Sequence, residues 1–310
     1  MKFQQVIEAV YFNPWSITDA GWRDINRIVR PHILGEALPP SVQSFIAARM
    51  ELSSKVKAEV ALEKLQADAD GDDAPDTDFF GQPIEQFQVT PDGLAIIPIF
   101  GPLINHASLM DQMCGACSYQ RIQSNLQEAL ATPGIKRIIL KIGSPGGMCN
   151  GMIETVRRVF QVREAGIPIK AISDTLIGSA AYALAAACDS IEITESTTIG
   201  SVGSFCAILD SSKAYEIEGL LVQVFKSGEF KGAGMDGTSL SKAQKEEYQQ
   251  RSNYFGEQFR EVVRSTRNIE EALLQGQVFI GEQAVENGFA DGIVDDLSSG
   301  YAPSEEDEDE

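Results

Sequence analysis

The central part of the chain alternates between short apolar runs and longer segments that place apolar residues at helical spacing. The apolar runs predict buried strands at 94–101, 137–142, 168–173 and 190–194. The helical pattern occurs at 119–130, 151–165 and in the Ala-rich segment that follows Ser179. Strands that alternate with helices in this way predict an α/β fold with a largely parallel sheet.

The regions on either side of this core have different patterns. Residues 1–66 are predicted to be a mainly helical N-terminal segment, because apolar residues recur at helical spacing from Trp15 onward. Residues 67–90 combine acidic residues with Pro and Gly and predict a linker. The core domain is therefore expected at 91–297, and the acidic residues 298–310 are expected to form a disordered tail.

The charge of the chain narrows the classes of partner. The formal net charge is −20, which argues against binding to nucleic acid or to anionic membrane surfaces. The chain has no apolar run of 18 residues and no signal-peptide pattern at its start, so a cytoplasmic protein without a membrane anchor is expected.

Cys114 and Cys117 form a C-x-x-C pair without further ligands nearby, so no metal site is expected.

Two turns of chemical interest are predicted at one edge of the sheet, where ligands of parallel sheets bind. Ser179 lies between a strand and a helix, either as an ordinary N-cap or as a nucleophile whose small neighbours admit a substrate backbone. The turn S-P-G-G at 144–147 is either a simple tight turn or a source of unobstructed N–H groups for an oxyanion hole. The N–H groups of Gly147 and Ala180 are the natural donors.

A nucleophilic serine needs a base, and the residues alone leave that base open. The chain has only two histidines, His32 and His106, both before Ser179 in the sequence. A lysine can act instead when burial lowers its pKa toward neutrality. The stretch V-Q-V-F-K-S-G-E-F-K-G-A-G offers Lys226 beside the apolar run and Lys231 in a Gly-rich loop.

Several spaced motifs together resemble the S49 peptidase family, which comprises signal peptide peptidase A proteins and their phage relatives. The motifs are S-P-G-G, S-A-A-Y-A-L-A-A-A-C-D-S-I, T-I-G-S-V-G-S, K-S-G-E-F-K and G-Q-V-F-I-G-E-Q-A-V-E-N-G-F-A-D-G-I-V-D, in order over about 94–296. The resemblance implies a ClpP/crotonase-like fold and a Ser–Lys dyad without a cofactor. By position it assigns Ser179 as nucleophile, Lys231 as base, and the Gly147 and Ala180 N–H groups as oxyanion donors.

The variant S-A-A-Y, where bacterial members usually have S-G-G-Y, is similar to phage head-maturation proteases. The resemblance therefore implies a serine endopeptidase that processes capsid, scaffold or portal proteins, forms a homo-oligomer, and acts in the host cytoplasm or inside the procapsid. Two alternatives stay open: a cytoplasmic bacterial S49 peptidase that degrades signal-peptide remnants or other peptides, and a non-catalytic scaffold component of capsid assembly.

Overall fold

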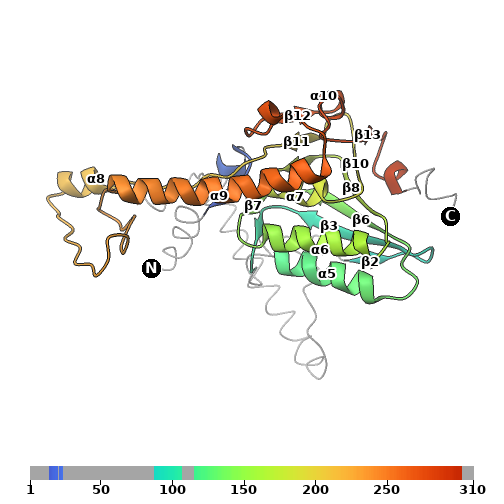
Figure 1. Cartoon of the computed structure of the whole chain (residues 1–310), viewed down its shortest axis with the longest axis horizontal. Coiled ribbons are helices and arrows are strands. Elements are labelled where there is room, and N and C mark those ends of the chain that lie inside the picture. Colours follow the sequence, from blue (N-terminus) through green and yellow to red (C-terminus); the bar gives the residue numbers. More distant parts are fainter. Residues whose placement is uncertain (1–13, 20, 24–86, 107–114, 302–310) are drawn as a thin grey trace, which may run out of the picture.

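The computed structural model describes residues 14–19, 21–23, 87–106 and 115–301 (Figure 1). Most of the predicted helical segment 1–66, most of the linker 67–90 and most of the acidic tail lie outside the described residues, so those predictions stay untested. No helix in the described part of the chain combines the length and apolar composition needed to cross a membrane.

A six-stranded sheet forms the centre of the fold, with strand order β13-β10-β8-β6-β3-β2. Its strands are β2 (Gln88–Val89), β3 (Leu94–Phe100), β6 (Arg137–Gly143), β8 (Ile169–Ser173), β10 (Ser190–Ile193) and β13 (Gly292–Ile293). Only the edge pair β2–β3 is antiparallel, and the other neighbours are parallel. The apolar runs form strands because both faces of a parallel sheet are covered and favour Ile, Leu and Val. The predicted α/β class is confirmed.

Four helices pack on or beside this sheet: α5 (Tyr119–Ala131), α6 (Met152–Glu164), α7 (Ala180–Ala186) and α9 (Lys242–Thr266). The helices α5 and α6 lie side by side against the sheet (Figure 1). Every residue of α7 is buried, which its all-apolar sequence permits. The long helix α9 contacts α7 near one end and extends away from the core toward α8 (Ser212–Ile217) at the other (Figure 1).

Two smaller sheets adjoin the central one. The first has the order β1-β7-β4-β5 and consists of β1 (Trp15–Ile17), β4 (Leu103–Ile104), β5 (Cys117–Ser118) and β7 (Gly146–Met148). The second has the order β12-β11-β9 and consists of β9 (Leu176–Gly178), β11 (Thr198–Gly200) and β12 (Val278–Ile280). The short elements η1 (Glu271–Leu273), α10 (Glu282–Glu286) and η2 (Ser299–Tyr301) complete the C-terminal part.

The structure corrects three of the predicted boundaries. Trp15–Ile17 form a strand instead of beginning a helix, because they pair with β7 far along the chain. The last residues of the predicted linker form β2, which pairs with β3. The predicted disordered tail starts too early, because η2 is ordered and Gly300 within it is buried against Ile172.

Candidate active site

Ser179 lies at the junction between β9 and α7, where the chain turns sharply. Its backbone angles are φ 49° and ψ −116°, and its side chain makes no capping hydrogen bond although it stands at the N-cap position. Its N–H donates to the carbonyl oxygen of Gly200 at 2.7 Å. The Ser179 side chain therefore does not act as an ordinary helix N-cap.

The backbone of Ser179 is strained. Among the described non-glycine residues, only Ser179 and Ser201 have positive φ. A non-glycine residue in such a sparsely populated region costs on the order of 1–3 kcal/mol and persists only where the surrounding structure imposes it. Sharp strained turns between a strand and a helix expose nucleophilic serines in other hydrolases, so this geometry is compatible with a nucleophile.

The glycine turn predicted as an oxyanion loop lies directly against the Ser179 turn. The Ser144 N–H donates to Leu176 O at 2.9 Å, and the Gly178 N–H donates to Ser144 O at 2.8 Å. A methyl group added to Gly146 would lie 2.8 Å from Gly178 O and 2.9 Å from the Ala180 nitrogen. The structure therefore brings the two turns together.

Gly146 is a site residue that the sequence reasoning did not single out. Its φ of 93° is one that L side chains rarely adopt, and its Cα faces the Ala180 amide with no room for a side chain. The signal available in the sequence was the glycine pair itself, which did not show which glycine contacts the serine turn.

The two candidate oxyanion donors lie on the two contacting elements. Gly147 is the central residue of β7, where it pairs with Ser16 on one side and Leu103 on the other. Ala180 is the first residue of α7, and the first amides of a helix have no intrahelical acceptor. A negative charge near Ala180 would also be stabilised by the partial positive charge of these amides.

An open cavity of about 350 Å³ lies beside Ser179. Segment 201–205 forms one wall, α9 contributes Ser252, Gly256 and Arg260, and the N-terminal residues Ile17 and Asp19 close part of it. The serine itself is only 1% exposed. The residues that line the cavity are mostly polar and include Ser179 itself.

Lys231 and Lys226 do not line this cavity, and both are exposed. Their loop is attached to the start of α9, where Gln244 donates to the carbonyl oxygen of Glu229 at 2.9 Å. The loop also contacts Tyr248, whose hydroxyl donates to Ala233 O at 3.3 Å. The first α9 residue that lines the cavity is Ser252, and a helix rises 1.5 Å per residue, so the cavity begins about 12 Å along α9 from Gln244. Figure 1 shows α8 at the end of α9 that points away from α7. Within one copy of the chain, Lys231 therefore does not line the cavity beside Ser179.

The other residues considered in the sequence lie elsewhere. His106 lines a different cavity together with Glu154, and His32 and Cys114 lie outside the described residues. Burial raises the pKa of the Cys117 thiol to about 11. The described part of the chain contains no group of three metal-ligating side chains.

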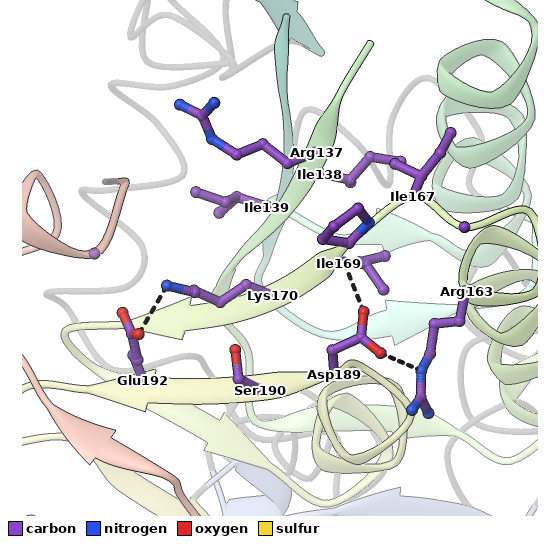
Figure 2. A pocket seen from close by; sticks show the side chains of 13 residues that line it. Arg137, Ile138, Ile139, Arg163, Ile167, Ile169, Lys170, Asp189, Ser190 and Glu192 are labelled. Carbon is purple, nitrogen blue, oxygen red and sulfur yellow. Dashed lines mark hydrogen bonds and ion pairs between the residues drawn. The ribbon is translucent and has the colours of Figure 1, made fainter. Parts of the chain in front are cut away.

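A second cavity of about 440 Å³ lies among charged residues of β6, β8, β10 and the end of α6 (Figure 2). Its charges are already paired: Lys170 with Glu192 at 2.7 Å, and Arg163 with Asp189 at 2.5 Å. Asp189 also accepts from the Ile169 N–H at 2.9 Å. These contacts join neighbouring elements and indicate a structural role.

Comparison with known proteins finds a family match over the part of the chain that contains Ser179. The sequence model of peptidase family S49 matches residues 161–298, which include Ser179, Ala180 and Lys231. The head-tail preconnector protein GP5 of Enterobacteria phage P21 is 25% identical over 262 residues, 83% of this chain and 52% of the relative.

Two further relatives have related names. Capsid assembly protease C of Escherichia phage lambda is 26% identical over 205 residues, 65% of this chain and 46% of the relative. Protease 4 of Haemophilus influenzae is 24% identical over 214 residues, 68% of this chain and 34% of the relative. The chain spans about half the length of the two phage relatives.

Proposed function

Residues 161–298 belong to peptidase family S49, and from this premise we propose that the chain is a serine endopeptidase with a Ser–Lys dyad in a ClpP/crotonase-like domain spanning about 91–297. The single observation that carries the proposal is the setting of Ser179. Its backbone is strained, its side chain does not cap α7, and its turn packs against the glycine turn beside an open cavity. A strained backbone at a buried hydroxyl has no evident structural benefit and fits a nucleophile.

The proposed mechanism assigns a role to each of four residues. The Ser179 hydroxyl attacks the carbonyl carbon of a peptide bond and gives its proton to the neutral Lys231 amine. The N–H groups of Gly147 and Ala180 stabilise the oxyanion. Lys231 passes the proton to the leaving amine, and the acyl-enzyme ester is then hydrolysed by a water molecule that Lys231 activates.

We further propose that Lys231 reaches Ser179 from a neighbouring copy of the chain. Lys231 lies on an exposed loop at the far end of α9, and this position supports delivery to an adjacent subunit. The active unit would then be a homo-oligomer in which each site uses Ser179 of one subunit and Lys231 of the next. Closed rings form when such head-to-tail contacts repeat with a suitable rotation.

The proposed substrates are capsid, scaffold or portal proteins of a phage head, cut in the host cytoplasm or within the procapsid. The names of the two phage relatives support this choice. The name Protease 4 supports the alternative of a peptidase without a role in capsid assembly. A non-catalytic assembly component is the third possibility that the test must separate.

The test is co-expression of the full chain with the capsid and scaffold proteins encoded beside it, followed by intact mass measurement. Fragments are expected with the wild type and absent with Ser179→Ala. Identical masses in both, with capsid proteins still co-purifying, would favour the assembly component. Identical masses without binding, together with cleavage of short peptides by the wild type alone, would favour the free peptidase.

Mixing two inactive variants tests where the base comes from. Ser179→Ala and Lys231→Ala are each expected to be inactive, whereas co-assembled subunits should recover activity in about a quarter of their sites if the dyad crosses the interface. Lys226→Ala is the matched control and should keep activity, because its Nζ already donates to Glu229 O at 2.9 Å within the loop. No recovery on mixing would contradict the shared site.

A further inference from the structure

The strand β1 is hydrogen-bonded along both of its edges, next to the Ser179 turn. On one edge, Trp15 exchanges both backbone hydrogen bonds with Phe205, at 2.8 and 2.9 Å. On the other edge β1 runs antiparallel to β7. A peptide that is paired on two sides in this way lies in a groove, here between β7 and the segment at Phe205, and pairing with a strand edge is how extended peptides bind by strand addition.

The register of β1 on β7 places one carbonyl group at the candidate oxyanion donors. The Cys149 N–H donates to Pro14 O at 3.2 Å, and the Thr18 N–H donates to Pro145 O at 2.9 Å. Hydrogen-bonded pairs alternate along an antiparallel ladder, so the intervening pair Ser16–Gly147 is also hydrogen-bonded, with the Gly147 N–H donating to Ser16 O.

The same carbonyl oxygen lies near the second donor. A methyl group on Gly146 would lie 2.3 Å from Ser16 O and 2.9 Å from the Ala180 nitrogen. The Ser16 oxygen and the Ala180 nitrogen are therefore both close to the same position beside Gly146. A substrate attacked by Ser179 must place its carbonyl oxygen between these donors. Ser16 therefore holds the position that the attacked residue of a substrate would take.

The side chains of this segment fill the groove. Ser16 is fully buried, and its hydroxyl donates to Gly203 O at 2.8 Å. Ile17 lines the Ser179 cavity and is 3% exposed. A methyl group on Gly178 would lie 2.5 Å from the Thr18 Cγ2. A second peptide backbone cannot enter the groove while residues 14–18 occupy it.

We propose that residues 14–18 are an intramolecular occupant of the substrate groove, bound in the register of a substrate with Ser16 as the residue whose carbonyl faces Ser179. That the groove binds a substrate rests on the proposed function. That residues 14–18 occupy the groove does not depend on whether the chain cleaves anything. Substrate enters as an extended segment with a small residue at the Ser16 position, and β1 must leave first.

The experiment fixes β1 in place with a disulfide. The Ser16 Oγ lies 3.4 Å from the Cys149 Sγ, so Ser16→Cys in the full chain brings two sulfur atoms close enough to be joined by an oxidant. The double variant Ser16→Cys with Cys149→Ser is the matched control, because it carries the same substitution and cannot form the bond. Intact mass and peptide mapping verify the disulfide.

Oxidation is expected to lower the cleavage rate of Ser16→Cys by at least about 10-fold, a difference of about 1.4 kcal/mol, and reduction should restore it. The control should not respond to either treatment. An oxidised chain that cuts as fast as the reduced one would overturn the proposal and leave the protease assignment intact. Failure of the disulfide to form in the folded chain would overturn it as well.

A binding measurement separates this proposal from the proposed function. The probe is a labelled peptide with the sequence of residues 13–18, Asn-Pro-Trp-Ser-Ile-Thr, and the readout is fluorescence anisotropy. The full-length Ile17→Asp variant, whose buried charge disfavours docking of β1, is expected to bind it at least about 10-fold more tightly than oxidised Ser16→Cys. If Ile17→Asp does not fold, Ile17→Thr replaces it. Equal binding by both forms overturns the proposal, even if no variant cleaves any protein.

Discussion

The backbone N–H of Ser179 donates to the carbonyl oxygen of Gly200 at 2.7 Å, so the residue at the start of α7 is tied to the last residue of β11. The preceding pair, Gly178 and Gly200, is already in register between the parallel strands β9 and β11. The serine therefore cannot relax without breaking this connection. Its strained angles are imposed by the sheet beside it rather than by α7.

Replacing Ser179 by glycine or alanine should separate the cost of strain from the loss of the hydroxyl. Both variants are expected to be inactive, because neither has a nucleophile. Ser179→Gly should be the more stable of the two by about 1 kcal/mol, since glycine accepts the positive φ, and its Tm should be higher by about 2–4 °C. Thermal unfolding of both full chains measures the difference. A lower Tm for Ser179→Gly would show that the serine is not strained.

Arg267 should contribute more to the stability of the fold than Arg264 does. Its guanidinium is 8% exposed and makes two bonds to Asp291, at 2.7 and 2.8 Å, and Asp291 in turn accepts from the Ile191 N–H at 2.7 Å. Lysine cannot reproduce this two-point contact, so Arg267→Lys is expected to reduce the free energy of unfolding by about 2–3 kcal/mol.

The matched control is Arg264→Lys on the same helix. Arg264 pairs with Glu257 and Glu271, but its side chain is 40% exposed and the pairs are screened by solvent. Its replacement should lower the unfolding free energy much less than Arg267→Lys does, because solvent-exposed ion pairs contribute little to stability. Urea denaturation of both variants gives the comparison, and similar losses in the two would contradict the importance of the Arg267–Asp291 pair.

Much of the core could be predicted from local pattern. The apolar run of β6, Arg137–Gly143, and the helical spacing of α5 were sufficient, because both elements bury a face that their own sequence defines. The junction at Ser179 was also visible, since small residues on both sides of a serine mark a close backbone approach.

The features that depend on distant pairing could not be predicted. Trp15–Ile17 are apolar at both ends, and the residues after them have helical spacing, so nothing local indicates a strand. Their partner strand β7 lies about 130 residues later, at Gly146–Met148. The position of Lys231 likewise depends on the length and direction of α9. The sequence shows that a lysine is available and does not show how far from Ser179 one copy of the chain holds it.

Cys149 should report the departure of β1 from its groove. Burial is the main cause that raises the pKa of this thiol to about 12, with its Sγ beneath Ser16. At pH 8 almost none of this thiol is ionised, so alkylation by iodoacetamide should be very slow and should become faster as the pH rises.

Ile17→Asp is expected to accelerate alkylation of Cys149 at pH 8 by at least about 10-fold, because it exposes the thiol and lowers its pKa. The buried Cys188, directly after α7, provides an internal control, since its rate should change much less. Peptide mapping after timed alkylation distinguishes the two cysteines. Equal acceleration at both would indicate general unfolding instead of release of β1.

Gly147 should tolerate no side chain if its amide is an oxyanion donor. A methyl group at this position would lie 1.9 Å from Leu103 O, so β7 must move and carry the Gly147 N–H away from Ala180. Loss of one aligned donor typically lowers kcat by about 10²–10³-fold, and Gly147→Ala is expected to show a loss of this size on any protein that the wild type cleaves. Gly292→Ala is the control, because its added methyl group would meet nothing within 4 Å. If Gly147→Ala folds with the Tm of the control and keeps wild-type kcat, the Gly147 amide does not hold the oxyanion, and Gly146 becomes the donor to test next.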